Sequence, residues 1–477
     1  MKWLWTSADL IAAMHGRPVG PMPEGVTGIS IDSRAISAGE AFFAIKGDRV
    51  DGHDFATLAA ANGAALLVVS EAKLPALGRL TTPMIVVPDV LEALVDLGCA
   101  ARDRTAARIV AVTGSVGKTT SKEMLRLALS PSGAVHASVA SFNNHWGVPL
   151  TLARMPEDTD YGIFEIGMNH PGEIRPLVAM VRPHVALVTT IAAAHLGNFR
   201  DLEEISAAKA EIFEGVVPGG HAILNRDNAQ YGALETAARA AGVANIHGFG
   251  ADPAAEFRLI DYTGTPAGGV LRAFIGGHTL EVPMRAAGRH IAENAVAVLG
   301  AVHLAGGDLE KAMAGLVTLQ PEKGRGRRHR LSHGAGWFTL IDESYNANPA
   351  SMQAALALLR DSEPHDGGRR VALLGDMLEM GAFSAEAHAE LASPLAEAGI
   401  KDVWLAGPEM AALVSALPED VRKEYRQDAD ELAAFALEAV RPGDVLMVKS
   451  SNGIGFSRIV AALLDKYSPF PERERDT

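Results

Sequence analysis

Cysteine is nearly absent from this chain of 477 residues, in which Cys99 is the only one. A single cysteine excludes an intrachain disulfide, so we expect a reducing compartment, the cytoplasm. The N-terminus lacks the long apolar core of a signal peptide, and no uncharged apolar stretch is long enough to span a bilayer. We therefore expect no membrane insertion. Low-complexity tracts and internal repeats of solenoid period are also missing.

An excess of positive charge is lacking as well. The net charge of −14 argues against nucleic acid as a partner. The one basic segment, Lys323–Arg330, is short and better suited to a small anionic ligand. An apolar content of 48% with 21% charged residues indicates a globular chain. Its length favours about three domains.

The order of predicted elements indicates an α/β fold with three domains. Residues 1–88 are expected to form a small α/β domain, with strands at 26–31, 41–45, 66–69 and 84–87 and a helix around 55–62. Residues 89–320 are expected to form a central domain, because strands at 109–113, 161–166, 185–191 and 221–224 alternate with helices, which is typical of a parallel sheet. Antiparallel strands within 257–283 and a helix at 291–304 complete it.

A third domain, residues 321–477, is expected after a linker. Pro and Gly punctuate residues 320–326, where the charge also shifts. A second alternation then begins, with strands at 338–341, 371–374, 403–406 and 445–448. The topology is Rossmann-like, but this part of the chain has no phosphate loop of its own.

A phosphate-binding loop is the most informative motif. The run Ile109–Thr113 predicts a buried strand, and Gly114, Ser115, Val116 and Gly117 predict a tight turn before a helix that opens at Lys118. In this order backbone N–H groups can surround an anion, Lys118 can reach the outer phosphates, and Thr119, followed by Thr120, can offer its hydroxyl to Mg²⁺. Val112 stands where the longer motif has its first glycine, so an ordinary Gly-rich turn is the alternative. The flanking strand and helix favour a site for ATP or GTP in a P-loop ATPase domain.

Three further residues of the central domain are unusual for structure alone. Glu165 interrupts an apolar strand, where a carboxylate is costly without a cation; an edge strand with Glu165 facing water is the alternative. His195 follows the strand at 185–191, at the sheet edge where such folds bind ligands; a loop histidine with a local hydrogen bond is the alternative. Lys209 lies on the apolar face of a helix, where a snorkelling lysine is the commoner outcome. A desolvated lysine, however, favours the neutral amine, which can add CO₂ to form a carbamate.

These residues carry a strong resemblance to the Mur ligase family, the ATP-dependent amide-forming enzymes of peptidoglycan synthesis. The resemblance covers nearly the whole chain and rests on segments 113–120, 143–151, 165–170, 192–195, 208–213, 342–349, 374–381 and 449–453. Segments Tyr345–Pro349 and Gly375–Glu379 resemble the branch that joins D-alanyl-D-alanine to a UDP-N-acetylmuramoyl tripeptide. The resemblance therefore implies these two substrates, and a monomer is expected.

The resemblance also implies roles for the matching positions. Lys118 and Thr119 would hold phosphates and a first Mg²⁺, Glu165 would bridge two Mg²⁺ ions, and His195 with carbamylated Lys209 would complete the second metal site. The remaining ATP contacts would come from Asn294 near the adenine, Arg325 or Arg327 at phosphate, and Asp342, Asn346 and Asn348 in a closing loop. The substrates would contact Ser33, Arg34, Lys46, Gly47 and His53 at the uridine nucleotide, together with Asn143 and Lys449.

Two positions depart from the family pattern. Ile291 replaces the Asn that usually follows Gly-Arg-His, and Ser450 replaces the Gly of Lys-Gly-Ser, which leaves the adenine contact and the geometry beside Lys449 open. Asn348-Pro349 also suits a plain helix N-cap that needs no ligand.

The implied reaction begins when ATP phosphorylates the terminal carboxylate of the tripeptide. The amine of D-alanyl-D-alanine then attacks the acyl phosphate, and phosphate leaves. The third peptide residue, diaminopimelate or lysine, stays open. The alternatives are a sister ligase such as a folylpolyglutamate synthase, and a nucleotide-binding scaffold without ligase activity.

Overall fold

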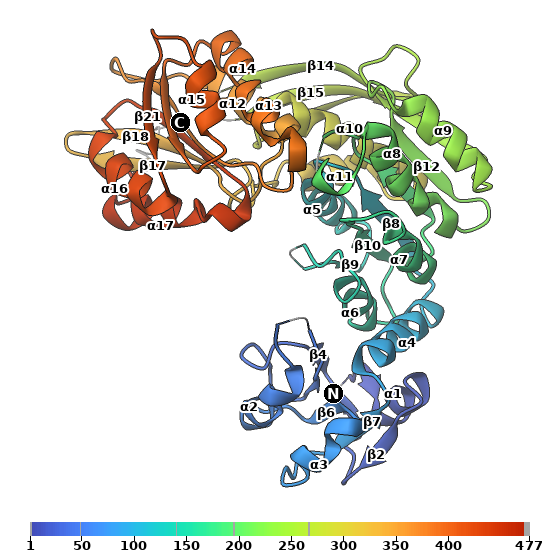
Figure 1. Ribbon diagram of the computed structural model, residues 1–477. Coiled ribbons are helices and arrows are strands. Elements are labelled where there is room, and N and C mark those ends of the chain that lie inside the picture. Colours follow the sequence, from blue (N-terminus) through green and yellow to red (C-terminus); the bar gives the residue numbers. More distant parts are fainter. Residues whose placement is uncertain (1, 48, 140, 194–195, 266–267, 472–477) are drawn as a thin grey trace.

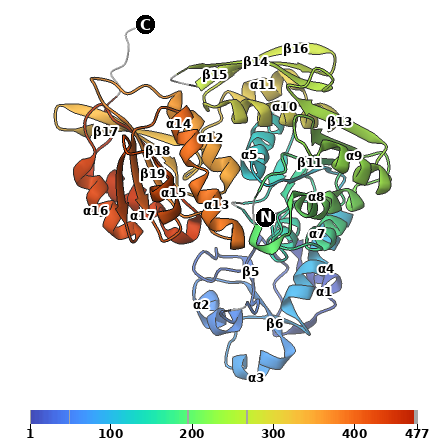
Figure 2. The same cartoon turned by 45° about the horizontal axis from the view of Figure 1, so that its top comes forward.

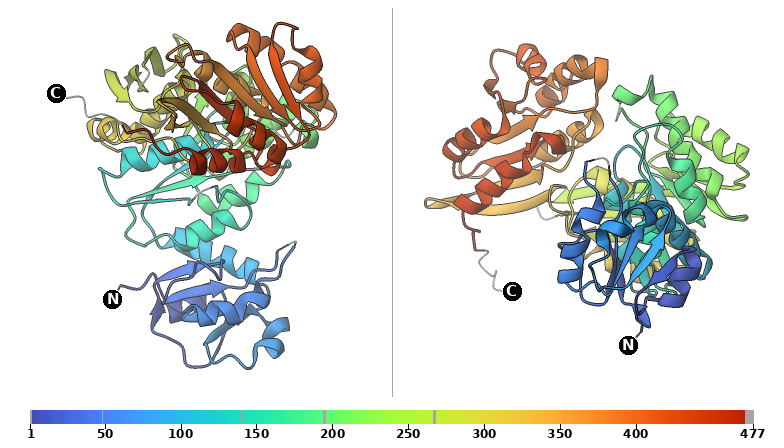
Figure 3. Two further views of the ribbon diagram at one scale, coloured as in Figure 1. Left: turned by 90° about the vertical axis from the view of Figure 1, so that its left-hand side faces the viewer. Right: turned by 60° about the horizontal axis from the view of Figure 1, so that its bottom comes forward.

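The computed structural model describes residues 2–47, 49–139, 141–193, 196–265 and 268–471. It contains three α/β units, as the sequence predicts, each built on its own main sheet (Figure 1). The central unit lies between the N-terminal and C-terminal sheets in the left view of Figure 3. In Figure 2 the C-terminal unit stands beside the central one, and the N-terminal unit stands below it.

The N-terminal unit has a five-stranded sheet in the order β2-β7-β6-β5-β4. Strands β4 to β7 run parallel, and β2 is antiparallel to β7. Its strands are β1 (Trp5–Thr6), β2 (Arg17–Val19), β3 (Gly25–Val26), β4 (Gly28–Ser30), β5 (Glu40–Phe43), β6 (Leu66–Ser70) and β7 (Met84–Val87). Its helices are α1 (Ser7–Ala13), α2 (Ala56–Ala61) and α3 (Leu74–Leu77).

Helix α4 (Val90–Asp103) joins this unit to the next. Val90, Leu94 and Leu97 share one apolar cluster with the N-terminal sheet and with Leu150 and Ala153 of helix α6 (Gly147–Ala153). The boundary predicted after residue 88 therefore falls ahead of a helix that packs against both units, and it stays a prediction.

The central unit has a nine-stranded sheet in the order β16-β15-β14-β13-β12-β11-β8-β10-β9. Strands β8 to β14 pair in parallel, and β14, β15 and β16 form the predicted antiparallel meander. Its strands are β8 (Arg108–Thr113), β9 (Val135–Ala137), β10 (Tyr161–Glu165), β11 (Val185–Val188), β12 (His221–Asn225), β13 (Asn245–Gly250), β14 (Phe257–Thr265), β15 (Gly268–Ile275) and β16 (His278–Met284). Its other helices are α5 (Lys118–Leu129), α7 (Ile174–Val181), α8 (Leu202–Ala210), α9 (Tyr231–Ala240), α10 (Arg289–Leu304) and α11 (Leu309–Leu316).

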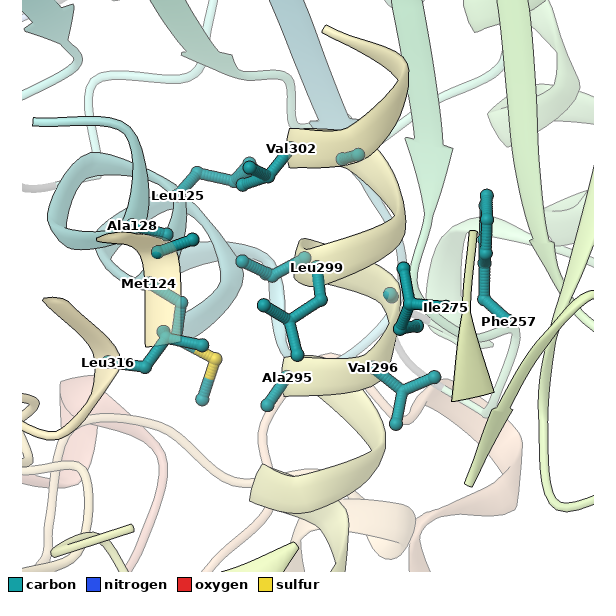
Figure 4. Packing of buried hydrophobic residues seen from close by; sticks show 14 of the residues in the cluster. Met124, Leu125, Ala128, Phe257, Ile275, Ala295, Val296, Leu299, Val302 and Leu316 are labelled. Carbon is teal, nitrogen blue, oxygen red and sulfur yellow. The ribbon is translucent and has the colours of Figure 1, made fainter. Parts of the chain in front are cut away.

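Apolar packing fixes the helix that carries Lys118. Leu125 and Ala128 of α5 pack beside Leu299 and Val302 of α10 in one buried cluster (Figure 4). Burying a leucine or valine side chain stabilises the contact by roughly 1.5–3 kcal/mol. The N-terminus of α5 is thereby held at the carboxyl end of β8, where open α/β sheets bind ligands.

The C-terminal unit has a six-stranded sheet in the order β17-β18-β22-β19-β20-β21. Only the β17–β18 pair is antiparallel among its ladders. Its strands are β17 (Arg327–His333), β18 (Gly336–Glu343), β19 (Arg370–Gly375), β20 (Asp402–Ala406), β21 (Arg422–Arg426) and β22 (Val445–Lys449). Its helices are α12 (Pro349–Arg360), α13 (Ser384–Ala389), α14 (Ala392–Glu397), α15 (Ala411–Ala416), α16 (Ala429–Ala439) and α17 (Ser457–Lys466).

Several predicted strands differ from the observed ones by one or two residues, and two predictions differ more. The strand expected at 26–31 is divided, because β3 pairs with β1 while β4 pairs with β5. The strand expected at 185–191 ends at Val188, and the Thr189 hydroxyl that follows it donates to the Val116 carbonyl at 2.5 Å. In the parts of the chain that the structure describes, no helix combines the length and the apolarity needed to cross a membrane.

Candidate functional site

A cavity of about 540 Å³ opens between the central and C-terminal units. Its central wall comes from the loop after β8, the carboxyl end of β10 and the start of α10. The opposite wall comes from the segment before β17, the loop after β18, the first turns of α12 and the last residue of β22. The predicted site residues that line it are Ser115, Val116, Gly117, Lys118, Thr119, Thr120, Asn143, Glu165, Asn294, Arg325, Asn346, Asn348 and Lys449. The structure thus brings together most of the predicted nucleotide site.

The loop after β8 has the conformation of an anion-binding turn. Gly114 and Gly117 have φ angles of 148° and 90°, and Gly117 is the N-cap of α5. A Cβ at Gly114 would lie 2.0 Å from the Thr189 Oγ1, so only glycine fits there. The Lys118 ammonium donates to the Gly114 carbonyl at 2.7 Å, which folds the lysine back over the loop. The backbone N–H groups of this turn and of the first turn of α5 suit phosphate.

Asn294 of α10 faces the same loop. A Cβ on Gly117 would lie 2.9 Å from its amide oxygen. Ile291, one of the departures from the family pattern, also lines the cavity, one helical turn before Asn294. Burial, together with the charge of Lys449, lowers the pKa of His290 to about 4, so this cavity-lining imidazole is neutral at pH 7.

Glu165 is buried, and one of its carboxylate oxygens has no partner. Only 1% of the residue is exposed, and the Asn143 amide donates to its Oε1 at 2.7 Å. Its Oε2 is buried without a hydrogen bond. Strand β10 lies between β8 and β9, so Glu165 does not face water from an edge strand, and that alternative is wrong. A buried carboxylate oxygen without a donor fits a bound cation.

Two lysines with lowered pKa values belong to the same part of the molecule, the partly buried Lys118 and the buried Lys209. Burial lowers the pKa of Lys118, while the charge of Glu165 opposes that shift and Arg325 adds to it. Lys209 is 2% exposed, and burial together with the charge of Lys118 brings its pKa well below the ordinary value. Lys209 does not snorkel to solvent, so this alternative is also wrong. A lysine so placed is pushed towards its neutral amine.

The structure describes only part of the predicted metal site. His195 lies outside the described residues. Within the described ranges, no three His, Cys, Asp or Glu side chains gather as a ready-made metal site. Thr119, 3% exposed, and Glu165 both line the cavity, and hydroxyl and carboxylate oxygens are ligands that Mg²⁺ accepts.

The C-terminal wall adds charged and aromatic groups. The Arg325 guanidinium lies 4.1 Å from the centre of the Tyr345 ring, and the Tyr345 hydroxyl donates across the cavity to the Ser141 Oγ at 3.0 Å. The Lys449 ammonium donates to the Asn346 carbonyl at 3.0 Å and lies 3.5 Å from a Glu343 oxygen. Burial raises the pKa of Glu343 and lowers that of Lys449, and each charge opposes the other's shift.

Two predicted residues of this wall have structural partners. The Asp342 carboxylate is buried and accepts hydrogen bonds from the Gly324 and Ser344 N–H groups at 2.8 and 3.2 Å, so it shapes the loops rather than lining the cavity. The Asn348 side chain caps α12 by accepting from the Ser351 N–H at 2.9 Å, as the structural alternative expected. Of the two arginines left open, Arg325 lines the cavity, and Arg327 lies in β17.

The predicted uridine residues lie in the N-terminal unit, away from this cavity. Ser33 and Arg34 follow β4, and Lys46 and Gly47 follow β5, so both pairs stand at the carboxyl edge of parallel strands. His53 is 7% exposed.

Both ring nitrogens of His53 are engaged. Its Nδ1 lies 2.6 Å from the Asp51 Oδ1, and its Nε2 accepts from the Ser70 N–H at 2.9 Å. A contact of the ring with a nucleotide would have to replace one of these bonds.

Sequence reasoning missed Glu343, His290 and Ser141 as cavity residues. Glu343 ends the apolar strand β18 just as Glu165 ends β10, and that shared feature could have identified it. No pattern in the sequence pointed to Ser141, because the hydroxyl of Tyr345 from another unit gives it its place.

Family models, named relatives and solved structures all match this chain over most of its length. The Mur ligase family, catalytic domain matches residues 25–102, the Mur ligase middle domain matches residues 112–302, and the Mur ligase, glutamate ligase domain matches residues 326–452. A Rickettsia prowazekii protein named UDP-N-acetylmuramoyl-tripeptide--D-alanyl-D-alanine ligase is 33% identical over 433 residues, which cover 91% of this chain and 94% of that protein. An Escherichia coli protein of the same name is 34% identical over 440 residues, covering 91% and 93%. A crystal structure of MurF from Acinetobacter baumannii superposes with a TM-score of 0.83 at 29% identity, covering 97% of this chain and 99% of the other.

Proposed function

This chain belongs to the Mur ligase family, and we propose that it joins D-alanyl-D-alanine to UDP-N-acetylmuramoyl tripeptide with ATP, in peptidoglycan precursor synthesis. The observation that carries the proposal is that Lys118 of the phosphate loop interacts electrostatically with two buried groups, Glu165 and Lys209. A protein that only binds nucleotide has no need of a carboxylate and two desolvated lysines there. The alternative of a scaffold without activity is therefore disfavoured.

The phosphate loop binds and orients the ATP phosphates. Backbone N–H groups after β8 and at the start of α5 surround the anion, and Lys118 exchanges its bond to the Gly114 carbonyl for one to a phosphate oxygen. Arg325 reaches the same cavity from the C-terminal unit. These cations offset the charge that accumulates when two anionic groups, phosphate and carboxylate, approach each other.

Mg²⁺ would neutralise phosphate charge and polarise the phosphoryl oxygen when bound. The buried, partnerless Oε2 of Glu165 and the Thr119 hydroxyl would hold it. We propose two ions, the second held by Glu165, His195 and a carbamate on Lys209.

The carbamate proposal follows from electrostatics around Lys209. The neutral amine adds to the carbon of CO₂, forms an N–C bond and releases a proton, which leaves an anionic carbamate. The nearby Lys118 charge disfavours the ammonium of Lys209 but would favour the anion. The modification thus turns a repulsive pair of buried groups into an attractive one.

The reaction requires activation of a weak electrophile. The tripeptide carboxylate oxygen takes the γ-phosphoryl group, ADP leaves, and the dipeptide amine attacks the acyl carbon. The tetrahedral intermediate collapses to the amide, phosphate departs, and the amine loses its proton. The two walls of the cavity exclude water, which would otherwise hydrolyse the acyl phosphate.

The other roles are proposals on the same basis. Ser33, Arg34, Lys46, Gly47 and His53 hold the uridine nucleotide, in a domain that spans residues 1–88. The ATP domain spans residues 89–320, with Asn294 near the adenine, and the third domain spans residues 321–477. The protein works in the cytoplasm as a monomer.

Contacts to the substrates complete the proposed site. Asn143 and Lys449 contact the reacting substrates from opposite walls of the cavity, which both of them line. Asn346 and Asn348 close over the nucleotide, and Asp342 holds their loop in place from behind.

The test is product analysis with purified protein, ATP, Mg²⁺ and both candidate tripeptides. D-alanyl-D-alanine should be incorporated, with one ADP per amide, and mass spectrometry should identify the pentapeptide product. Without dipeptide, hydroxylamine should trap the acyl phosphate as a hydroxamate. If a single amino acid is the preferred amine, the chain is a sister ligase. If carboxylate oxygen never reaches phosphate during turnover, the acyl-phosphate mechanism is wrong.

A further inference from the structure

A second contact joins the central and C-terminal units outside the cavity. The Gly197 N–H, in the short 3-10 helix η3 (Leu196–Asn198), donates to the Glu379 carbonyl at 2.8 Å. Gly381 begins the 3-10 helix η5 (Gly381–Phe383) and has a φ of 55°. A Cβ on Gly381 would lie 2.8 Å from the Gly197 Cα, and a Cβ on Gly197 would lie 3.1 Å from the Glu379 carbonyl. The two backbones touch so closely that a side chain at either glycine would crowd the contact.

The C-terminal side of this contact is anchored in its own unit. The Met377 N–H donates to the Nε2 of the buried His388 at 2.9 Å. The Leu378 N–H donates to the Ser451 Oγ at 2.9 Å, and the Ser451 N–H donates to the Asp376 carbonyl at 3.0 Å. Segment 376–381, which follows β19, is therefore held in place by hydrogen bonds within the C-terminal unit.

The same bonds lead to the wall of the cavity. The Ser451 hydroxyl also donates to the Ala347 carbonyl at 3.3 Å. Ala347 lies between Asn346 and Asn348, and all three line the cavity. Ser451 therefore bonds both to segment 376–381 and to the loop that contains Ala347, which lines the cavity.

The central side of the contact leads back to the phosphate loop. The loop that follows β11 reaches Ala192, whose N–H and carbonyl bond the Ser115 Oγ at 3.0 and 2.9 Å. The Asn228 amide holds the Ile191 carbonyl at 2.8 Å. Ile191 and Ala192 are thus bonded to the central unit beside the phosphate loop, and Gly197 is bonded to the C-terminal unit.

We propose that Gly197 and Gly381 form an interdomain clasp that holds η3 of the central unit against the segment before η5 of the C-terminal unit and so keeps the two walls of the cavity in position. The clasp couples the C-terminal wall, through Ser451, to the central half of the site. Gly197 and Gly381 are positioning residues, since neither lines the cavity. This inference rests on the proposed ligation, because only a reaction that uses both walls needs them held together.

The chain offers a matched control for the test. Gly399 has a φ of 65°, close to the 55° of Gly381, but a Cβ there meets nothing within 4 Å. Gly381→Ala and Gly399→Ala therefore impose similar backbone strain, and only the first crowds the clasp. Gly197 has no left-handed φ, so Gly197→Ala tests the contact without strain.

We expect Gly381→Ala to weaken the contact between the two units most and Gly197→Ala to weaken it less. Gly399→Ala should behave like the unchanged protein. Two readouts are independent of activity: the radius of gyration from small-angle X-ray scattering, and amide exchange of peptides covering 196–198 and 376–383. Gly381→Ala should increase both. Its kcat should fall on the order of ten- to a hundredfold, as small misplacements of reacting groups do. The KM for the UDP substrate should not change.

Three outcomes would overturn the clasp. Gly381→Ala could match the unchanged protein in scattering and exchange, Gly399→Ala could show the same losses, or KM for the UDP substrate could rise together with an unchanged kcat. If the unchanged protein fails to ligate D-alanyl-D-alanine, the proposed function fails instead. Scattering and exchange still decide the clasp in that case.

Discussion

Replacing Lys209 by methionine should abolish ligation and, in the absence of ligands, stabilise the protein. Lys209 is 2% exposed, and burial together with the Lys118 charge lowers its pKa. Methionine is similar in length and carries no charge. Replacing buried charged groups by apolar ones of similar volume is neutral or stabilising by about 1–4 kcal/mol. Each kcal/mol should raise the midpoint of the transition that includes the central unit by roughly 2–4 °C.

The stability gain should depend on pH. Lys209 loses its proton in the folded protein well below 10.5, the ordinary value that the unfolded chain retains. Between these two pKa values the unfolded chain binds more protons, so the wild-type free energy of unfolding rises with pH. The destabilisation caused by burying the Lys209 charge is greatest below the pKa of Lys209 in the folded protein. It is absent above the pKa of this lysine in the unfolded chain. The advantage of Lys209→Met should therefore shrink as pH rises through this window.

Scanning calorimetry in CO₂-free buffer across that pH window measures this effect. Lys311→Met, on α11 with a side chain 57% exposed, is the control and should change stability by less than about 0.5 kcal/mol. A Lys209→Met protein that is less stable than wild type, or whose advantage is independent of pH, would refute the electrostatic reasoning. Retained ligation in this variant would refute the carbamate.

The remaining predictions concern charge and contact at three other places. Lys118→Ala should keep its circular dichroism spectrum but lower kcat on the order of a hundredfold or more, because a charge-assisted contact to phosphate is lost. Burial raises the pKa of Asp51, but hydrogen bonds from Lys73 and His53 outweigh it and lower that pKa below the usual value. The stabilisation that the ionised Asp51 gives to the folded protein is therefore present above the ordinary carboxyl pKa and lost in acid. Asp51→Asn should lower the midpoint of urea unfolding at pH 7 by an amount worth about 1–3 kcal/mol, and the loss should disappear in strong acid. Tyr345→Phe removes the bond to Ser141 and should raise the KM for ATP up to about tenfold, since one hydrogen bond contributes about 0.5–1.5 kcal/mol.

The parallel core strands could be predicted because burial on both faces makes them continuous apolar runs. Strand β8 and the predicted run at 109–113 differ by one residue. The strands that sequence reasoning missed include β17 and β21, which form the two edges of the C-terminal sheet. β21 has the sequence Arg-Lys-Glu-Tyr-Arg, which has neither the run nor the alternation that predicts a strand. Pairing with β20 on one side is enough to order it.

The candidate site also has parts that the sequence predicts and parts that it does not. The phosphate loop is local in sequence, so a glycine turn before Lys118 could be predicted from neighbouring residues alone. The Tyr345–Ser141 bond joins residues 204 apart, and no local pattern encodes it. The burial of Lys209 could be anticipated from helix periodicity, but its interaction with Lys118, which lies 91 positions earlier on another helix, could not.

Buried carboxylates separate into two kinds, and the distinction locates the chemistry. Asp444 is fully buried and accepts hydrogen bonds from the Arg369 side chain at 2.6 Å and the Arg441 N–H at 2.9 Å, so its charge is satisfied by the fold. Among the residues that the structure describes, Glu165 is the one carboxylate with a buried oxygen that has no partner. Leaving that oxygen unpaired costs about 1–3 kcal/mol or more, which the packing of the central unit has to offset. A ligand that supplies a cation there removes the cost on binding, so the folded state gains stability from the same interaction that prepares the reaction.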